Sequence, residues 1–333
     1  MRAIFLCNRE KDVQRVYAGD VIARFRTLVA LDEKIYGKED VLAAPAAFAD
    51  VEIILSTWGM PAFTEEEIAS CFPHLKSVFY AAGTVQSFAR PFLSRGVKVF
   101  SAWAANAVPV AEYTVAQILL AGKGFFAQTR HMQAQRLDKA KARMAETRGN
   151  YGARVGLIGC GMIGSMVAEK LKAHRLDVVA YDPFLSKERA DALGVKRVEL
   201  EELFSTAQVV SNHLANNKQT KGMLNRKLFE KLVPFATFLN TGRGAQVVED
   251  DLVQVLQARP DLTAVLDVTY PEPPEADHPF YTLPNCFLTP HIAGSLGDEV
   301  VRMAEYMAEE LAAYLAGAPT RYEVSEKMLE TMA

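Results

Sequence analysis

The residues best suited to acid–base chemistry in this sequence are one arginine, one glutamate and one histidine. Arg243, Glu272 and His291 each follow a short apolar run in the C-terminal half of the chain. In an open sheet of parallel strands the carboxyl ends converge on one crevice, so we expect these side chains to lie close together. An imidazole can give up a proton near neutral pH, a carboxylate beside it favours its charged form, and a guanidinium binds a carboxylate through two donors. The set suits reduction of a ketone, in which hydride addition leaves an alkoxide that needs a proton.

Each of the three residues also has a structural explanation. Arg243 lies between two glycines and could be a loop residue exposed to water. Glu272 lies between two prolines, in what could be a rigid turn, and His291 follows a proline and could be an ordinary structural histidine. Taken one at a time, these residues do not establish a function.

A glycine-rich run in the middle of the chain has the spacing of a dinucleotide-binding turn. It reads Gly159-Cys160-Gly161-Met162-Ile163-Gly164 and lies between a predicted strand and a predicted helix. We expect Gly159 to permit the tight turn, Gly161 to let a pyrophosphate approach the backbone, and Gly164 to let the helix pack on the strand. The phosphates would then lie at the positive end of that helix, beside Met162 and Ile163.

An acidic residue at the end of the next predicted strand bears on the choice of cofactor. Asp182 follows Gly164 at close to the spacing of roughly 20 residues that is expected of a ribose-binding acid. Its carboxylate would accept hydrogen bonds from the ribose 2′-hydroxyl and repel a 2′-phosphate, which favours NAD over NADP. Lys187 and Arg189 could weaken that preference or could simply be solvated, and Asp182 could instead cap the turn at Pro183.

Apolar runs that alternate with helical patterns predict two parallel sheets with helices on both faces. In the first third of the chain we expect strands at 3–6, 52–56, 76–80 and 97–100. A second sheet should contain six strands, at 154–158, 177–181, 209–213, 237–240, 264–268 and 286–288. The predicted fold class is therefore α/β, with two doubly wound domains, Rossmann-like or flavodoxin-like, and a cleft between them.

Four other segments have helical or mixed patterns. Residues 64–70 begin with a threonine cap and acidic residues, and residues 298–316 form a final amphipathic helix. Residues 109–126 are apolar nearly all round, which predicts a long buried helix. The charged segment 129–150 fits either a solvated helix and loop or an arm that contacts another subunit.

Composition and charge exclude several classes of protein. Of the 333 residues, 50% are apolar and 23% are charged, a balance typical of globular rather than disordered chains. The net charge is −3 and the basic residues are scattered, so we expect no binding to nucleic acid or to a membrane surface. The four cysteines lack disulfide or metal-ligand spacing, and no apolar run is long enough to cross a bilayer. We expect a cytoplasmic protein without a metal site.

Several segments that contain the candidate residues together resemble the D-isomer-specific 2-hydroxyacid dehydrogenase family. The resemblance covers about residues 75 to 312 and includes NAVPVAEYTVAQILL, GLIGCGMIG with Asp182, SNHLANNKQTKGML, NTGRGAQVVEDDLVQVL and LDVTYPEPPEADHPFYTLPNCFLTPHIAGS. It implies an NAD-dependent oxidoreductase that reduces a small 2-oxoacid to a D-2-hydroxyacid, or the reverse, and that forms a homodimer.

The resemblance also implies a role for each candidate residue. Arg243 would bind the carboxylate and 2-oxygen of the substrate, His291 would be the general acid or base, and Glu272 would pair with His291. Asp267 would anchor the nicotinamide amide. The cofactor crevice would be completed by His213, Thr241 and Gly294.

The family's domain organisation implies that residues 1–103 and 295–333 form a substrate (catalytic) domain and residues 104–294 an NAD-binding domain. A loop of the family's substrate domain holds the substrate carboxylate on its backbone N–H groups, and here it lacks the usual aspartate. We expect this loop to bind substrate through Ala82, Gly83 and Thr84, with Trp58 either walling the pocket or lying in the core. No cluster of arginine or lysine that would suit a phosphorylated substrate is evident beside Trp58.

Two other functions fit the same fold. An NAD-sensing binding protein would show little turnover, but such a protein has no need of an acid–base pair. Formate oxidation would need further polar groups on the substrate side, which the sequence does not show.

Overall fold

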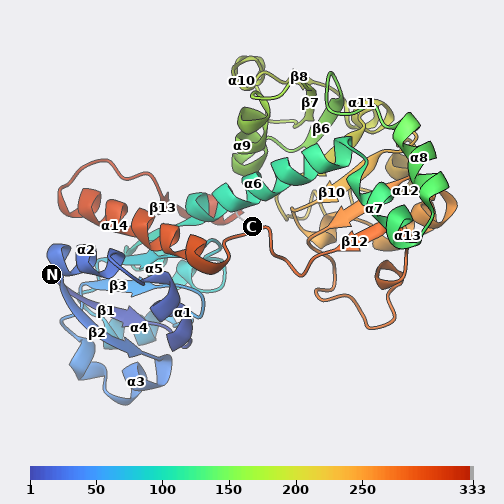
Figure 1. The fold of residues 1–333 in the computed structure, drawn as a ribbon. Helices are drawn as coiled ribbons and strands as arrows, with labels where there is room; N and C mark the ends of the chain where they lie inside the picture. Colours follow the sequence, from blue (N-terminus) through green and yellow to red (C-terminus); the bar gives the residue numbers. More distant parts are fainter. Residues whose placement is uncertain (331–333) are drawn as a thin grey trace. The chain divides into compact units, whose positions relative to one another are not determined.

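A computed structural model describes residues 1–330 of the chain, which form two compact units. The first unit comprises Met1–Ala107 and the C-terminal segment from Ser295 onward, and the second comprises Val108–Gly294. Each unit is built around a mainly parallel sheet with helices on both of its faces (Figure 1). The predicted α/β fold with two doubly wound sheets is confirmed.

The sheet of the first unit has six strands in the order β13-β5-β4-β3-β1-β2, and only β13 runs antiparallel to its neighbour. The strands are β1 (Arg2–Leu6), β2 (Ala30–Tyr36), β3 (Ile53–Ser56), β4 (Ser77–Tyr80), β5 (Lys98–Ser101) and β13 (Glu323–Val324). The four predicted strands are present, whereas β2 and β13 are not predicted by the sequence. The strand β2 lies at the edge of the sheet and its residues are exposed or only half-buried, so it lacks the apolar run that marks the others.

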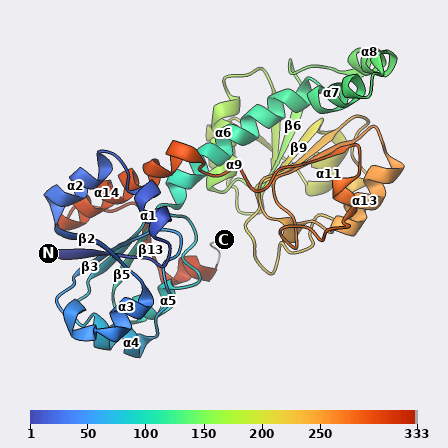
Figure 2. The ribbon, with the colours of Figure 1, turned by 60° about the horizontal axis from the view of Figure 1, so that its bottom comes forward.

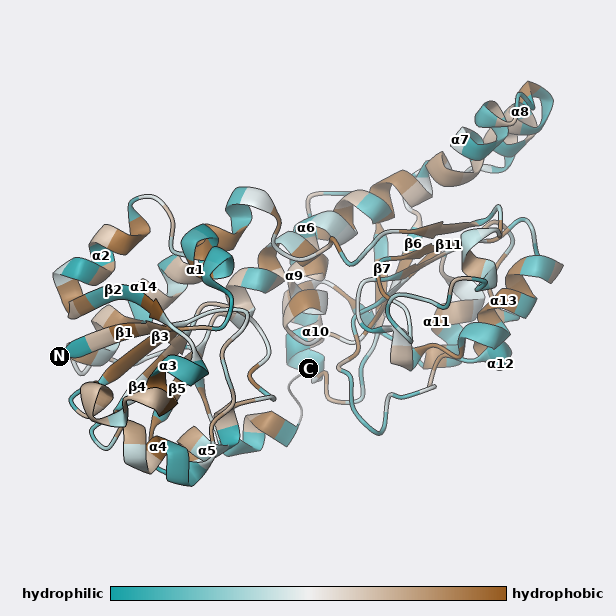
Figure 3. Ribbon diagram, turned by 90° about the horizontal axis from the view of Figure 1, so that it is seen from below, coloured by the Kyte–Doolittle hydropathy of each residue, from teal (hydrophilic) through white to brown (hydrophobic). Residues whose placement is uncertain are grey.

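Helices cover both faces of this first sheet (Figure 2). One face carries α1 (Glu10–Val16), α2 (Val21–Leu28) and α14 (Val301–Leu315), and the other carries α3 (Lys38–Ala43), α4 (Glu65–Cys71) and α5 (Ala89–Ser94). The predicted cap of α4 is confirmed, because the Thr64 hydroxyl accepts from Glu67 N and the Glu67 carboxylate accepts from Thr64 N. The inner strands β1, β3 and β4 between these layers are apolar (Figure 3), which is why they need cover on both sides. Three short 3₁₀ turns complete the unit: η1 (Pro45–Phe48), η4 (Gly297–Val300) and η5 (Glu326–Glu330).

The long apolar helix α6 runs over Trp103–Gly122, so the predicted range of 109–126 is wrong at both ends. The helix starts earlier because it continues through Pro109, which lies inside it. It stops at Gly122 because Gly124 adopts a φ of 65°, in the left-handed region that ends helices. The charged segment beyond forms two further helices, α7 (Phe125–Gln133) and α8 (Leu137–Glu146), which pack against each other.

The sheet of the second unit has seven parallel strands in the order β12-β11-β10-β9-β6-β7-β8. All six predicted strands are present, and the two-residue strand β8 is an addition. The strands are β6 (Arg154–Ile158), β7 (Asp177–Tyr181), β8 (Lys196–Arg197), β9 (Val209–Asn212), β10 (Thr237–Asn240), β11 (Thr263–Leu266) and β12 (Cys286–Leu288). Successive residues enter separate cores on opposite faces, for example Phe238 and Leu239 of β10.

Helices α6 and α9 (Met162–Leu171) cover one face of this sheet, and α11 (Leu200–Thr206), α12 (Arg226–Phe229) and α13 (Glu249–Ala258) cover the other. The helix α10 (Lys187–Leu193) and the 3₁₀ turns η2 (Gly244–Gln246) and η3 (Pro279–Tyr281) lie in connections between strands. Most connections are thus short and helical, as a doubly wound sheet requires.

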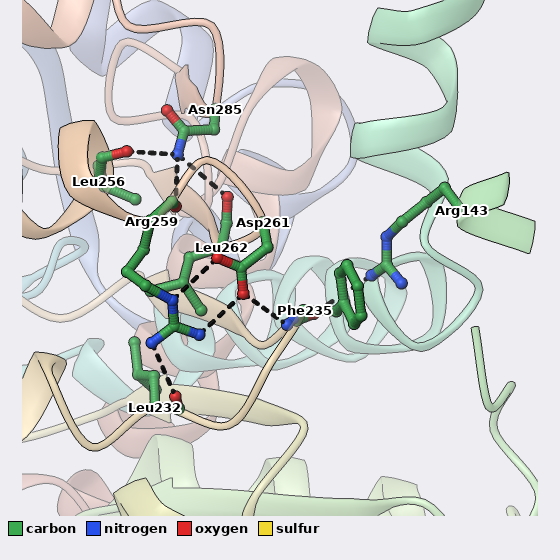
Figure 4. Close-up of polar contacts among 8 residues, drawn as sticks. All are labelled: Arg143, Leu232, Phe235, Leu256, Arg259, Asp261, Leu262 and Asn285. Atoms are coloured by element: carbon green, nitrogen blue, oxygen red, sulfur yellow. Dashed lines mark hydrogen bonds and ion pairs between the residues drawn. The ribbon is translucent and has the colours of Figure 1, made fainter. Parts of the chain in front are cut away.

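The amino edge of the second sheet is closed by its own polar groups (Figure 4). Arg259 donates two hydrogen bonds to the Asp261 carboxylate, at 2.9 and 2.8 Å, and Asp261 also accepts from Phe235 N at 3.1 Å. The Asn285 amide donates to carbonyls of the turn before β11, and the Arg143 guanidinium of α8 lies 4.2 Å from the centre of the Phe235 ring. These contacts attach α8 to the loop that precedes β10.

None of the helices within residues 1–330 is both long enough and apolar enough to span a membrane.

Candidate functional site

The glycine-rich turn joins β6 to α9 in the way that the sequence predicts. Gly159 has a φ of 88°, and a Cβ atom there would lie 2.9 Å from the carbonyl oxygen of His213. A Cβ atom on Gly164 would overlap the carbonyl oxygen of Gly159, so the turn and the helix could not pack with a side chain there. Gly161 instead faces open space just before α9, whose first turn contains Met162 and Ile163. The turn therefore has a closed side against the sheet and an open side at a helix N-terminus.

The acidic residue predicted to bind ribose lies directly beside this turn. Asp182 follows β7, and its carboxylate accepts from Cys160 N at 2.7 Å and from Phe184 N at 2.8 Å. Arg189 also reaches the turn, because its Nη2 donates to Cys160 O at 3.0 Å and to Ser165 Oγ at 2.9 Å. Arg189 thus contacts the glycine turn, and its side chain is at the same time exposed to water.

His213 and Thr241 lie on the same carboxyl edge, after β9 and β10. The Nε2 atom of His213 lies 2.9 Å from Ser211 Oγ, whereas its Nδ1 atom is buried without a protein partner in the described part of the chain. Burial lowers the pKa of His213 to about 4, so the ring is neutral at physiological pH. The Thr241 hydroxyl is 3.1 Å from that of Thr114 on α6.

A buried amide network, which the sequence analysis missed, shapes the loop that carries Arg243. Asn212 Nδ2 donates to Asn240 Oδ1 at 3.0 Å, and Asn240 Nδ2 donates to Arg243 O at 3.1 Å. Gln246 Oε1 accepts from Arg243 N at 3.2 Å, while its Nε2 donates to Leu214 O at 2.6 Å. Amides at two adjacent strand ends were the only available signal, and strand ends carry many polar residues.

The Arg243 guanidinium lies at this edge and is largely buried. Its Nη1 donates to Gly242 O at 2.8 Å. Burial lowers the pKa of Arg243, and the nearby negative charge of Glu272 works in the opposite direction. The guanidinium still carries its charge at neutral pH, because its unperturbed pKa is above about 12.

Glu272 and His291 are in direct contact, at 2.6 Å between Oε1 and Nδ1. An ionised carboxylate can only accept, so the proton between them lies on Nδ1. The Nε2 atom of His291 has no hydrogen-bond partner within residues 1–330 and is available to a ligand. Both side chains are about half-exposed, at 40% for Glu272 and 45% for His291.

Asp267 holds the loop on which His291 lies. His291 has a φ of 55°, which is unusual for any residue other than glycine. The Asp267 carboxylate accepts from Thr289 Oγ1 at 2.6 Å and from the backbone N–H groups of Ile292 and Ala293 at 2.8 and 2.9 Å. These bonds fix both sides of His291, and Gly294 follows directly after them.

The loops expected to bind substrate lie at the carboxyl edge of the first unit's sheet. Thr57 Oγ1 donates to Ala81 O at 2.8 Å, and Ser101 Oγ donates to Ala82 O at 2.9 Å. Within residues 1–330 no backbone carbonyl accepts from the N–H groups of Gly83 and Thr84. The loop therefore turns its carbonyls toward the protein and leaves two donors for a ligand.

Two arginines lie beside Trp58, where the sequence analysis expected no basic cluster. The Arg15 guanidinium lies 5.7 Å from the centre of the Trp58 ring, and the side chain of Arg9 packs beside Gly59. Asp12 lies between them, 3.8 Å from each guanidinium. The arginines are far apart from Trp58 in the sequence, and only the pairing of β1 with β3 brings them together.

No group of three or more histidine, cysteine, aspartate or glutamate side chains that could hold a metal ion occurs within the described range. The main features of the candidate site are the open glycine turn at 159–164, the neighbouring carboxylate of Asp182, and the pair formed by Glu272 and His291.

Comparisons with known proteins agree with these features. Residues 115–293 match the model of the D-isomer specific 2-hydroxyacid dehydrogenase NAD-binding domain, which is more than half of the chain. The chain is 34% identical over 236 residues to D-3-phosphoglycerate dehydrogenase of Archaeoglobus fulgidus, a match that covers 71% of this chain and 44% of the relative. It belongs to the D-isomer-specific 2-hydroxyacid dehydrogenase family.

Two other similar proteins extend the comparison. The chain is 31% identical over 279 residues to a formate dehydrogenase of Chaetomium thermophilum, covering 80% of this chain and 75% of the relative. A D-isomer specific 2-hydroxyacid dehydrogenase from Lactobacillus delbrueckii ssp. bulgaricus, solved in an NAD complex, shares the fold with a TM-score of 0.77 at 18% identity, covering 98% of this chain and 100% of that one. The chain spans about half the length of the D-3-phosphoglycerate dehydrogenases that it matches.

As a member of this family, the chain contains an NAD-binding domain, and the residues present fit that cofactor. Gly161 leaves room beside the N-terminus of α9 for a pyrophosphate, and Asp182 lies where a ribose hydroxyl can donate to it. The buried, unpartnered Nδ1 of His213 is a further polar atom at the same edge.

Proposed function

We propose that this protein is an NAD-dependent oxidoreductase that reduces a small 2-oxoacid to a D-2-hydroxyacid, or catalyses the reverse reaction. The observation that carries the proposal is the 2.6 Å contact between Glu272 and His291, on the strand edge that also bears the glycine turn. A protein that only sensed NAD would have no use for a paired imidazole with one nitrogen left free.

The proposed mechanism assigns one task to each side chain. The bound cofactor supplies the hydride. Arg243 binds the carboxylate and the 2-oxygen of the substrate, so that the carbonyl carbon is oriented for attack. His291 donates its Nε2 proton to the developing alkoxide, and Glu272 stabilises the imidazolium and keeps its Nδ1 proton in place. In the oxidative direction His291 takes up the same proton.

The cofactor and the substrate are assigned to different parts of the chain. We propose that residues 104–294 bind NAD through Gly159, Gly161, Met162, Ile163 and Gly164 of the turn, and through Asp182, His213, Thr241, Asp267 and Gly294. Residues 1–103 and 295–333 form the substrate domain. There the free N–H groups of Gly83 and Thr84, together with Ala82, would hold the substrate carboxylate, and Trp58 would line the pocket.

The two arginines beside Trp58 favour a second substrate candidate, a 2-oxoacid with a second anionic group. Several relatives are D-3-phosphoglycerate dehydrogenases, whose name includes a phosphorylated acid. Arg9 and Arg15 are only weakly paired with Asp12, and such exposed pairs contribute at most about 1 kcal/mol, so a phosphate or carboxylate can compete for them.

We also propose a homodimer. The helices α7 and α8 and the turns beside them expose several large apolar side chains, including Phe125, Met132, Leu137 and Met144. An exposed apolar group of this kind is typical of an interaction surface.

The test is NADH oxidation with glyoxylate, hydroxypyruvate, pyruvate, a bulkier 2-oxoacid and 3-phosphohydroxypyruvate. We expect turnover of at least one of them, and a loss of roughly a hundredfold or more in kcat for His291→Ala. Arg15→Gln should lower kcat/KM selectively for the phosphorylated acid if that is the substrate, with the exposed Arg24→Gln as the matched control. NADH binding without any turnover would instead identify an NAD sensor.

A further inference from the structure

A second pairing of a carboxyl group with an imidazole lies behind the loop that carries Glu272. Glu249, the first residue of α13, accepts from Tyr270 N at 2.8 Å through Oε1. Its Oε2 lies 3.6 Å from His278 Nε2, and the two side chains are only 11% and 15% exposed. Neither residue takes part in the mechanism proposed above.

The position of Glu249 links it to Glu272 through the backbone. Tyr270 precedes Glu272 and His278 follows it, so one carboxyl group contacts the loop on both sides of the residue that pairs with His291. Within the loop, Thr269 Oγ1 also donates to Pro271 O at 2.9 Å. The orientation of the Glu272 carboxylate thus depends on the segment 270–278, which Glu249 holds in place through its contacts with Tyr270 and His278.

Glu249 is largely buried and has few charged neighbours. His278 Nδ1 accepts from Phe280 N at 3.2 Å, so a neutral His278 ring carries its proton on Nε2, the atom that faces Glu249. The other titratable groups that act on the pair are Asp250 on the same helix and the Cys286 thiol on β12. Burial raises the pKa of Glu249 to about 7, with Asp250 adding to the rise and the Tyr270 N–H opposing it.

A role at the helix terminus alone does not explain this arrangement. Acidic residues are favourable in the first turn of a helix, and α13 has three of them there, Glu249, Asp250 and Asp251. Asp250 fills that role while exposed to water. A carboxyl group that only interacted with the helix dipole would gain nothing from burial.

We propose that Glu249 is a positioning residue that holds the loop around Glu272, and thereby keeps the Glu272 carboxylate directed at His291. The inference rests on the proposed function, in which Glu272 and His291 handle the proton. It assigns Glu249 no contact with substrate or cofactor.

Three variants test this role through kcat, the KM of the 2-oxoacid and the Kd of NADH. Glu249→Leu removes the acceptor for Tyr270 N, and we expect kcat to fall by roughly tenfold to a hundredfold, since misplacement of about 1 Å can cost a hundredfold. Glu249→Gln keeps an acceptor and resembles the protonated carboxyl, so kcat should stay within about threefold of wild type. Asp250→Asn is the matched control and should leave kcat unchanged. The Kd of NADH should be the same in all of them.

A double-mutant cycle separates positioning from a general loss of structure. If Glu249 acts through Glu272, the double variant Glu249→Leu with Glu272→Gln should be no slower than Glu272→Gln alone. Multiplicative losses, or a Glu249→Gln variant as slow as Glu249→Leu, would overturn the proposal. If Glu249→Leu does not fold, His278→Gln takes its place in the cycle with the same two outcomes.

Hydrogen exchange keeps the test independent of the proposed function. If wild-type protein reduces none of the 2-oxoacids, the proposed function fails. The contact by which Glu249 holds the loop around Glu272 can still be measured without substrate, through the exchange rates of the loop amides. Amides in residues 269–278 should exchange faster in Glu249→Leu than in Asp250→Asn. Equal exchange in the two variants would contradict the role of Glu249 as a positioning residue.

Discussion

The two sheets of this protein have similar parallel frameworks but very different carboxyl edges. In the second unit the strands end at charged or polar side chains, including Asp182, His213, Arg243 and Asp267. In the first unit the central strands are followed by uncharged residues, such as Thr57 after β3 and Ala81 after β4. The carboxyl edge of the second sheet therefore presents charged side chains, whereas that of the first presents the backbone donors of Gly83 and Thr84, with Arg9 and Arg15 beside Trp58.

The two edges are also held in place by different means. In the second unit, buried amides and the Asp267 carboxylate fix the loops of Arg243 and His291. In the first unit, the hydroxyls of Thr57 and Ser101 donate to loop carbonyls. A carboxylate or amide can bind several N–H groups and hold a strained loop, whereas a hydroxyl that donates to a carbonyl leaves the N–H groups of the loop outward.

At the amino edge of the second sheet most of the charged groups are paired with each other. Arg259 and Asp261 bond each other and the neighbouring backbone (Figure 4), whereas Arg143 lies against the Phe235 ring and its buried Nε and Nη1 atoms have no hydrogen-bond partner within residues 1–330. At the carboxyl edge of the same sheet, Nε2 of His291 and Nδ1 of His213 have no protein partner within residues 1–330.

The largest expected effect comes from adding a side chain at Gly164, the most closely packed position of the glycine turn. In Gly164→Ala the new methyl group would overlap the Gly159 carbonyl oxygen, which requires the backbone to move. We expect a loss of about 3 kcal/mol or more, seen as a fall of roughly 10 °C in Tm, and loss of NADH binding. Calorimetry and NADH fluorescence measure both quantities, and an unchanged Tm would show that the turn is less tightly packed than described.

Two glycine substitutions test whether the two carboxyl edges bind different ligands. A methyl group added to Gly161 or to Gly83 would meet no other atom within 4 Å, so both alanine variants should keep the Tm of wild type. Gly161→Ala should raise the Kd of NADH by about tenfold or more, because the methyl group lies where a pyrophosphate approaches. Gly83→Ala should leave that Kd unchanged and raise the KM of the 2-oxoacid by a similar factor. Equal effects of the two variants on both constants would remove the distinction between the units.

The last effect concerns His213 of the second unit, a partly exposed residue whose ring Nδ1 atom is buried. Burial lowers the pKa of His213 to about 4, whereas an unfolded histidine titrates near 6.5, so below that pH the unfolded chain binds more protons. Stability from a neutral His213 is therefore present above pH 6.5 and lost as the pH falls toward 4, by about 1–3 kcal/mol.

The difference in Tm between wild type and His213→Gln should thus shrink between pH 7 and pH 4.5. The exposed His74→Gln is the control and should follow wild type at every pH. Parallel curves for His213→Gln and wild type would contradict the assigned burial.

Much of the second unit could be predicted from the sequence because its strands are continuous apolar runs buried on both faces. The strands β6, β7, β10 and β12 occupy the predicted ranges. The edge strand β2 could not be found in this way, since half-buried polar residues carry no apolar signal. The start of α6 was missed because Pro109 lies inside the helix.

The candidate site likewise contains parts that the sequence predicts and parts that it does not. The contact of Glu272 with His291 was inferred from the resemblance, and the structure places the two side chains together. The bonds of Asp267 to the loop of His291, the approach of Arg15 to Trp58 and the contact of Glu249 with Tyr270 join residues that are distant in the sequence. Such pairs depend on strand order and loop conformation, which local patterns do not specify.

The central claim is that the second unit's carboxyl edge supports hydride transfer to the 2-carbon of a 2-oxoacid. Its most direct test is the reaction of NADH in which both hydrogens at C4 of the nicotinamide are deuterium, with the best substrate of the panel, followed by mass spectrometry of the product. We expect one deuterium at C2 of the 2-hydroxyacid, formed by wild type and roughly a hundredfold or more slowly by His291→Ala. A protein that binds NADH yet transfers no deuterium to any 2-oxoacid would contradict the claim.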